Sequence, residues 1–188
     1  YFSAFVHRNE KRADGSKYIT HPLAVAEIII FEFQVFDLET ILAAIFHDNA
    51  ENSGWSWGTM FFIMEKISND RVPSFVFFLS KHYITAFGRV YFEMLYWARI
   101  IRVILVKLAD RTHNLRTLEF MSIQSQWRKL AETEQYFPSL ITIIMQDIML
   151  KENEHLAKNV VDVEDLPKRC KAVFDTAFQQ AREKIVTD

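Results

Sequence analysis

The stretch IIRVILVKLADRTHNLRTL, residues 100–118, decides how this chain folds. Taken alone, its opening run Ile100–Val106 has the pattern of a buried strand. The apolar spacing continues beyond that run to Leu115 and Leu118, however, and this length and period are typical of a helix. We therefore predict a helix here, and we expect an all-α fold for the chain.

The remainder of the chain has the same kind of helical spacing. Thr20 or His21 can cap one helix, with Pro22 at its first position, and Asp37 can cap the next helix. The predicted helices span residues 2–13, 22–36, 38–52, 55–67, 72–80, 89–120 with a break near Ala98, 123–136, 138–156 and 165–186. Because no repeat or convincing linker interrupts them, we expect residues 1–188 to form a single domain.

The composition argues against several classes of protein. Of the 188 residues, 50% are hydrophobic and 24% are charged, and there are only four Gly and four Pro. This is a globular composition with too few breakers for an all-β sandwich. The single cysteine, Cys170, cannot form an internal disulfide and favours a reducing, cytoplasmic compartment. A net charge of −2 predicts no binding to nucleic acid or to an anionic membrane, and no apolar run approaches the ~20 residues of a membrane span.

One group of polar residues follows the apolar run Ile41–Phe46. His47 and Asp48 are adjacent, and Glu51 lies four residues after His47, so the three side chains can share one face of a helix. Asn52 ends the group. So abrupt a change from apolar to polar residues often indicates a functional site, although an ordinary frayed helix end would have the same pattern.

Two further groups centre on His21, at a helix start, and on Asp110, after a long apolar run. A carboxylate in such a run must be paired or bound to a cation to be buried. Asn114 and Thr117 follow Asp110 by four and seven residues, on the same stripe of a helix. His21 alone could be a helix cap with its ring at the surface. Two imidazoles and two carboxylates from separate helices would instead suit an octahedral Mn, Mg or Fe site, and zinc fits less well because no thiolate is near.

Two stretches of the chain resemble the motifs of a known family. Residues 7–22, HRNEKRADGSKYITHP, are similar to the family pattern H-R-x-x-x-R-x-x-G-x-x-Y-I-x-H-P, and residues 102–117, RVILVKLADRTHNLRT, resemble a second motif. Both belong to the hydrolase domain of the RelA/SpoT homologues, in the HD superfamily of metal-dependent phosphohydrolases. The resemblance covers residues 2–140 and implies an HD-domain helical bundle, followed by C-terminal helices over residues 141–188.

The resemblance also implies an activity and a role for individual residues. The activity is that of a (p)ppGpp 3′-pyrophosphohydrolase of the stringent response, which forms GDP or GTP and pyrophosphate. One Mn²⁺ would be bound by four residues: His21, His47, Asp48 and Asp110. This ion would act on a water and on the 3′-diphosphate together. Glu51 would orient or deprotonate the water, and Arg12 would stack against the guanine base. Asn114 and Thr117 would contact the sugar and base of the nucleotide.

Two positions depart from the family pattern. Asn52 stands where the family has a second catalytic acid, and an amide can hydrogen-bond a water but cannot accept its proton. Ala13 stands where a basic residue is usual. The four metal-ligand positions are unchanged, so we expect metal binding to be retained and the catalytic rate to be affected.

These departures leave two alternatives to a (p)ppGpp hydrolase. One is an HD phosphohydrolase that acts on another nucleotide, such as the 2′-phosphate of NADPH. The other is a nucleotide-sensing domain in which Asn52 has weakened catalysis. The sequence contains no synthetase domain, so we expect a hydrolase domain alone, either as a small protein in itself or as part of a longer one. The sequence does not determine an oligomeric state.

Overall fold

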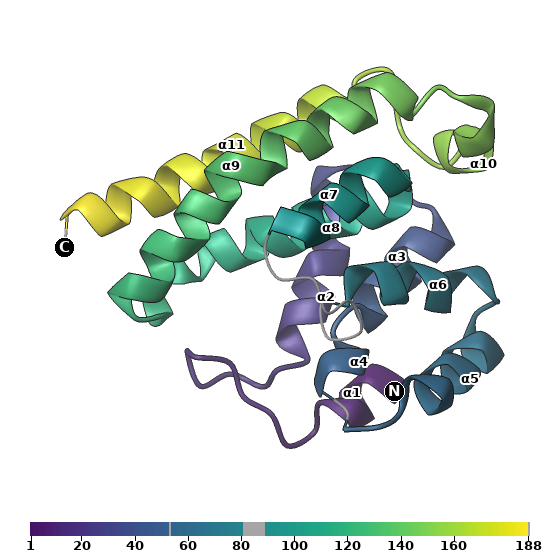
Figure 1. The fold of residues 1–188 in the computed structure, drawn as a ribbon, viewed down its shortest axis with the longest axis horizontal. Coiled ribbons are helices and arrows are strands. Elements are labelled where there is room, and N and C mark those ends of the chain that lie inside the picture. Colours follow the sequence, from purple (N-terminus) through teal and green to yellow (C-terminus); the bar gives the residue numbers. More distant parts are fainter. Residues whose placement is uncertain (53, 81–88, 188) are drawn as a thin grey trace.

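Helix α8 (Ile101–Arg116) lies at the centre of the molecule, and other long helices pack around it (Figure 1). This computed structural model describes residues 1–52, 54–80 and 89–187. Every residue from Ile101 to Thr112 is buried, so most of this helix has no solvent-facing side. The predicted helix is confirmed, and burial on all sides explains why its apolar run also fits a strand pattern.

Three helices cover one side of α8: α2 (Thr20–Glu27), α3 (Leu38–Phe46) and α6 (Arg71–Leu79). Helices α2 and α3 also pack against each other, and a π-helical turn, Ile28–Glu32, continues α2. This packing brings the first turn of α2 and the end of α3 close to the middle of α8.

Two long helices, α9 (Ile123–Asp147) and α11 (Leu166–Thr187), lie side by side and cover another side of α8 (Figure 1). Phe137 of α9 stacks on Phe174 of α11, with ring centroids 5.4 Å apart. Cys170 is buried in α11, where burial raises the pKa of its thiol to about 12. The last predicted helix, residues 165–186, matches α11 closely.

Helix α7 (Arg89–Ala98) precedes α8 and packs on α9. The predicted break near Ala98 is confirmed, because Arg99 has a φ of 50° and separates the two helices. Phe92 of α7 stacks on Tyr136 of α9 with ring centroids 4.5 Å apart.

Smaller elements complete the described fold. Helices α1 (Phe2–Val6), α4 (Asn49–Asn52) and α5 (Trp57–Ile67) form a second apolar cluster together with α3 and α6. Shorter helical pieces are Leu118–Phe120, Lys151–Asn153 and α10 (Glu154–Ala157). In the described residues β pairing is confined to two isolated bridges, Lys11 with Lys17 and Val35 with Val160.

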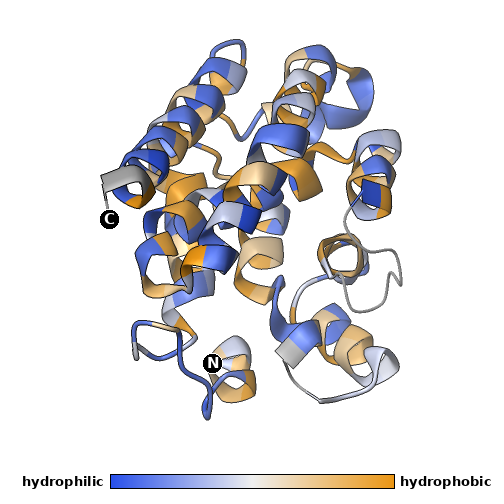
Figure 2. Ribbon diagram, turned by 60° about the vertical axis from the view of Figure 1, so that its left-hand side comes forward, coloured by the Kyte–Doolittle hydropathy of each residue, from blue (hydrophilic) through white to orange (hydrophobic). Residues whose placement is uncertain are grey.

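The all-α prediction is therefore confirmed. Figure 2 shows hydrophilic and hydrophobic residues interspersed along most of the helices, as expected for amphipathic helices that share a core. Among the helices described, none combines the length and the apolar character needed to cross a membrane.

The N-terminal segment differs from the prediction. A helix over residues 2–13 is wrong, because α1 ends at Val6 and the chain then turns back on itself. The Arg12 amide donates to the Ser16 carbonyl, and Gly15 at the turn has a φ of 84°. A positive φ is readily adopted by glycine, so this turn competes well with helix.

The start and end of α2 also differ. Thr20 is the first residue of the helix, so His21 and Pro22 lie inside its first turn and neither Thr20 nor His21 caps it. The His21 ring is buried, and the surface cap considered from the sequence is wrong. The helical backbone ends at Glu32, before the predicted end at residue 36.

The predicted helix over residues 38–52 is divided at His47. The Nδ1 atom of His47 donates to the Ala44 carbonyl at 2.7 Å and so occupies an acceptor of the last helical turn. The cap predicted at Asp37 is confirmed, because its carboxylate accepts from the Thr40 amide at 3.0 Å.

Pro138 does not separate two helices as predicted, because α9 continues through it to Asp147. Pro138 is exposed, whereas its neighbours Phe137 and Leu140 are buried. The proline ring therefore faces solvent, where local bending is tolerated, and burial of the opposite face keeps the helix intact. The predicted continuation of this helix to residue 156 is wrong as well.

Candidate functional site

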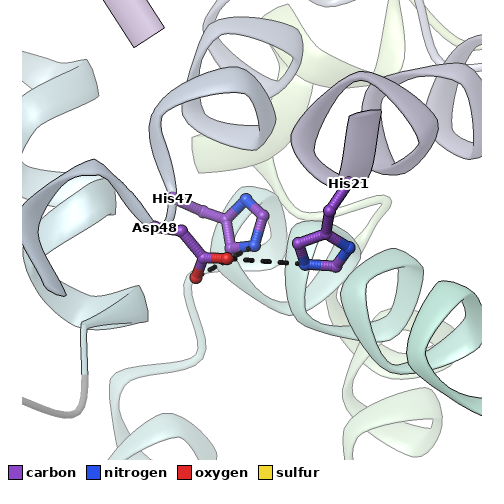
Figure 3. A group of neighbouring side chains, drawn as sticks. All are labelled: His21, His47 and Asp48. Carbon is purple, nitrogen blue, oxygen red and sulfur yellow. Dashed lines mark ion pairs between the residues drawn. The ribbon is translucent and has the colours of Figure 1, made fainter. Parts of the chain in front are cut away.

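Four side chains from three parts of the fold meet beside α8. His21 comes from the first turn of α2, and His47 and Asp48 come from the turn that directly follows α3. One ligand atom from each of these three lies within 4.8 Å of the others, and Figure 3 shows them turned toward one another. Asp110 of α8 joins them, with its Oδ1 3.3 Å from His21 Nε2 and 3.9 Å from His47 Nε2. We call His21, His47, Asp48 and Asp110 the His–Asp cluster.

The geometry of the His–Asp cluster fits a divalent cation. Neighbouring ligands of an octahedral ion with bonds of about 2.1 Å lie about 3 Å apart. His47 Nε2 is 3.2 Å from Asp48 Oδ1, and His21 Nε2 is 3.5 Å from Asp48 Oδ2. His47 Nε2 is buried and has no hydrogen-bond partner in the part of the chain that the structure describes. Because Nδ1 of the same ring donates to Ala44, this Nε2 is the atom available to a metal.

The charges of the cluster depend on one another. Burial opposes the charged form of His47, but Asp48 and Asp110 outweigh it and raise the pKa of His47 to about 9. Burial would raise the pKa of Asp48, but the charge of His47 outweighs this effect and lowers it. For Asp110 burial is likewise outweighed, chiefly by Lys107, and the pKa lies well below its usual value. The cluster therefore holds two carboxylates that favour a cation between them.

Other side chains hold these carboxylates in place. The Tyr18 hydroxyl donates to Asp48 Oδ2 at 2.7 Å. Lys107 Nζ donates to Asp110 Oδ2 at 2.9 Å, and Asn114 Nδ2 donates to Asp110 Oδ1 at 2.5 Å. Such contacts fix the direction of a carboxylate before a ligand arrives.

His113 orients His21 in a similar way. The Nδ1 atoms of the two rings lie 2.8 Å apart, so one of them donates to the other. Burial, followed by the charge of His21, lowers the pKa of His113 to about 4 and keeps its ring neutral near pH 7. If His21 binds a metal through Nε2, its Nδ1 carries the proton and His113 accepts it.

The His–Asp cluster borders a pocket of about 340 Å³. On one side, the turn after α1 brings in Arg12, whose Nη2 donates to Thr117 Oγ1 at 3.2 Å and to Asn114 Oδ1 at 3.4 Å. On another side, Glu51 of α4 lines the pocket with an exposed side chain. Ala13 also lines it. The pocket thus combines acidic and basic groups with a route to solvent.

The structure brings together nearly all of the site residues that the sequence singled out. Those that line the pocket are Arg12, His21, Asp48, Glu51, Asp110, Asn114 and Thr117. His47, the remaining member of the His–Asp cluster, is buried and lies 3.2 Å from Asp48, outside the pocket lining. Asn52 is the last residue of α4, and its side chain lies outside the described part of the structure.

Several residues of the site received no role from the sequence. Tyr18, Lys107 and His113 all lie inside the two motifs, but only their contacts reveal what they do. Lys107 had a usable signal, because a lysine three residues before Asp110 in an apolar run suggests a buried pair. Lys129 of α9 also lines the pocket, and nothing in the sequence indicated it.

The chain is similar in sequence to several curated proteins. It is 36% identical over 132 residues to a probable GTP pyrophosphokinase of Mycobacterium leprae, covering 68% of this chain and 16% of that protein. It is 35% identical over 142 residues to the bifunctional (p)ppGpp synthase/hydrolase SpoT of Escherichia coli, covering 71% and 19%. It is 33% identical over 150 residues to a probable guanosine-3′,5′-bis(diphosphate) 3′-pyrophosphohydrolase of Synechocystis, covering 74% and 19%. The chain therefore spans only 16–19% of the length of these relatives.

The fold also matches a solved structure. A metazoan orthologue of SpoT that hydrolyses ppGpp superimposes with a TM-score of 0.59 over 95% of this chain and 90% of that chain, at 22% identity. At this identity the match bears on the fold, and it confirms the predicted HD-type helical bundle. No family model matches the chain. The sequence similarity and the shared fold show that this chain belongs to the RelA/SpoT homologue family, within its HD-type hydrolase domain.

Proposed function

We propose that residues 1–188 form one metal-dependent domain that removes pyrophosphate from the 3′ position of ppGpp or pppGpp, leaving GDP or GTP. In this reaction a water oxygen bonds to the phosphorus next to the ribose 3′ oxygen. The bond between that phosphorus and the 3′ oxygen breaks, and the 3′ oxygen takes up a proton. The observation that carries the proposal is a cation-type cluster at the wall of a pocket that also contains Arg12 and Glu51. The names of the relatives support the choice of substrate.

Mn²⁺ is the ion that we propose for the His–Asp cluster. Two imidazole nitrogens and two carboxylates suit Mn²⁺, and the lone cysteine, Cys170, is buried in α11 and does not line the pocket. The buried Nε2 of His47, which has no hydrogen-bond partner among the described residues, supports a ligand at this point. When bound, a divalent cation lowers the pKa of a water and offsets the negative charge of a diphosphate.

Glu51 is the residue that we propose to hold the proton of the attacking water. It lies three residues after Asp48 and lines the same pocket, so its carboxylate is on the side of the cluster that substrate can reach. The neighbouring Asn52 can orient a water but cannot accept a proton. Proton transfer therefore depends on a single carboxylate, and we expect slower turnover than in a site with two acids.

Arg12, Asn114 and Thr117 are proposed to bind the nucleoside. A planar guanidinium can stack on a purine ring, and Arg12 is held at the pocket by its bonds to Asn114 and Thr117. When the nucleotide binds, Asn114 and Thr117 would release Arg12, and their amide and hydroxyl groups would hydrogen-bond to the sugar and base instead. Tyr18 supports the arrangement, because the Arg12 guanidinium lies 5.8 Å from its ring centre.

The direct test incubates the protein with ppGpp and Mn²⁺ and measures pyrophosphate and GDP. We expect both products in equal amounts, with none after chelation of the metal and none from His47→Ala. Metal analysis should find one ion per chain in the wild type and a loss of that ion in His47→Ala. The proposal is wrong if neither the wild type nor Asn52→Asp releases pyrophosphate.

Two other outcomes would identify the alternatives. Saturable binding of ppGpp without turnover would indicate a sensing domain, with Asn52 as the reason for the loss of catalysis. Release of phosphate from NADPH in preference to pyrophosphate from ppGpp would indicate a related phosphohydrolase with a different substrate. A panel of nucleotides given to the Mn²⁺-loaded protein distinguishes these cases.

A further inference from the structure

Lys129 is a basic residue of the pocket that comes from α9, far in sequence from both motifs. Among the residues that the structure describes, five Lys and Arg side chains line this pocket: Lys11, Arg12, Lys107, Arg111 and Lys129. Lys11 and Arg12 belong to the turn after α1, whereas the other three belong to the wall formed by α8 and α9. The α8–α9 wall is the side of the pocket that carries Asp110 of the His–Asp cluster.

The other two cations of this wall already have partners. Lys107 Nζ donates to Asp110 at 2.9 Å. Arg111 Nη2 donates to Glu132 at 2.7 Å, and its Nη1 donates to the Thr133 hydroxyl at 3.3 Å. For the ammonium of Lys129, no hydrogen bond or ion pair occurs with any residue in the ranges 1–52, 54–80 and 89–187.

The surroundings of Lys129 favour an anion. Its side chain is half-buried, and burial followed by the charge of Arg111 lowers the pKa of its ammonium. The charges of Asp110 and Glu132 act to raise the pKa of Lys129. These two carboxylates, however, accept hydrogen bonds from Lys107 and Arg111. A half-buried ammonium next to a second cation, and without an anion of its own, is stabilised when a phosphate approaches.

We infer that Lys129 binds the terminal phosphoryl group of the substrate's 3′-diphosphate, the group that departs as part of pyrophosphate. This inference rests on the proposed function. Lys129 lines the same pocket as Asp110, and its carbonyl accepts from Nη1 of Arg111, the residue after Asp110, at 3.2 Å, so Lys129 lies on the side of the pocket that holds the His–Asp cluster. The phosphoryl group next to the 3′ oxygen belongs at the His–Asp cluster, and the terminal one extends toward Lys129. Lys129 thus selects a diphosphate over a monophosphate.

The test measures binding of inorganic pyrophosphate and inorganic phosphate to Mn²⁺-loaded protein by calorimetry. In Lys129→Met we expect the affinity for pyrophosphate to fall about 10- to 100-fold, as for loss of one charge-assisted hydrogen bond, while the affinity for phosphate changes less than about threefold. Lys129→Arg should restore part of the loss. Lys151→Met is the matched control, because Lys151 is exposed and does not line the pocket. Should Lys129→Met fold poorly, Lys129→Gln takes its place.

A second arm distinguishes the two diphosphates of the nucleotide. GDP carries only the 5′-diphosphate, so its affinity should be the same in Lys129→Met and in the wild type. A loss of GDP binding with unchanged pyrophosphate binding would assign Lys129 to the other end of the nucleotide and overturn the inference. Equal pyrophosphate binding in Lys129→Met and Lys151→Met overturns it as well.

These binding experiments do not depend on turnover. If the wild type fails to hydrolyse ppGpp but Lys129→Met still loses pyrophosphate binding, the proposed function is wrong and the anion site stands. If the wild type hydrolyses ppGpp and Lys129→Met has the same KM and pyrophosphate affinity as Lys151→Met, the proposed function stands and the inference about Lys129 is wrong.

Discussion

His21 and His113 face each other through their Nδ1 atoms, which lie 2.8 Å apart. On its other side the His21 ring turns Nε2 toward Asp48 and Asp110, at 3.5 and 3.3 Å. A histidine that binds a metal through Nε2 carries its proton on Nδ1, and His113 is placed to accept it. His113 therefore orients the His21 ring, which is one of the four proposed metal ligands.

Replacing His113 should weaken metal binding. We expect His113→Ala to lower the affinity for Mn²⁺ about 10- to 100-fold, because the His21 ring loses the partner that sets its tautomer and direction. His113→Asn keeps an acceptor oxygen near the former Nδ1 and should recover part of the affinity. Titration calorimetry with Mn²⁺ measures the effect, and equal affinities in the wild type and His113→Ala would contradict it.

Glu51→Gln should impair catalysis and spare the metal. We expect kcat to fall about 100-fold or more, since the amide cannot take the proton of the attacking water. The metal content should remain that of the wild type, because Glu51 is not part of the His–Asp cluster. A variant with normal kcat would show that another group accepts the proton.

Asn52→Asp tests the departure from the family pattern. A second carboxylate beside Glu51 should raise kcat, because it adds a group that can accept a proton. Steady-state kinetics of the wild type, Asn52→Asp and the double variant with Glu51→Gln measure the change. An unchanged or lower kcat in Asn52→Asp would show that Asn52 is not what limits the rate.

The metal-free protein should lose stability as the pH rises. The pKa of His47 is raised from 6.5 to about 9 in the folded state, by Asp48 and Asp110 against the effect of burial. Such a group stabilises the fold fully below its unfolded pKa, and this stabilisation is lost as the pH passes from about 6.5 to about 9. The Tm of protein treated with a metal chelator should therefore fall over this pH range. The decrease in Tm should be smaller in His47→Gln. Identical slopes for the two proteins would rule out His47 as the cause.

The buried pair of Arg102 and Asp37 should matter more to stability than an exposed one. Arg102 donates to both oxygens of Asp37, at 2.9 and 3.0 Å, and both residues are buried. We expect Arg102→Met to lower the free energy of unfolding by about 3–5 kcal/mol, because it leaves a buried carboxylate without its cation. Arg116→Met breaks the more exposed pair with Glu32 and should cost about 1 kcal/mol or less. Urea denaturation compares the two, and similar losses would contradict this account.

The errors in the predicted helices have identifiable physical causes. Residues 2–13 have helical spacing, yet the Arg12 amide donates a hydrogen bond to the Ser16 carbonyl and the chain forms a turn. Pro138 usually ends a helix, yet burial of Phe137 and Leu140 on the opposite face keeps α9 continuous. At residues 12–16 a local turn with Gly15 at a positive φ outweighs the helical spacing, whereas at Pro138 burial that occurs only in the folded chain outweighs the local preference.

The sequence by itself determined the helical class, the position of α8 and the residue types of the His–Asp cluster. These follow from periodicity and from side-chain chemistry, which are properties of neighbouring residues. Only the tertiary structure decided that His47 turns a buried Nε2 toward Asp48, that His113 faces His21, and that Lys129 reaches the pocket without a partner among the described residues. Such relationships join residues that are far apart in the chain, so they depend on how α2, α3 and α9 pack against α8 and on which polar groups that packing buries.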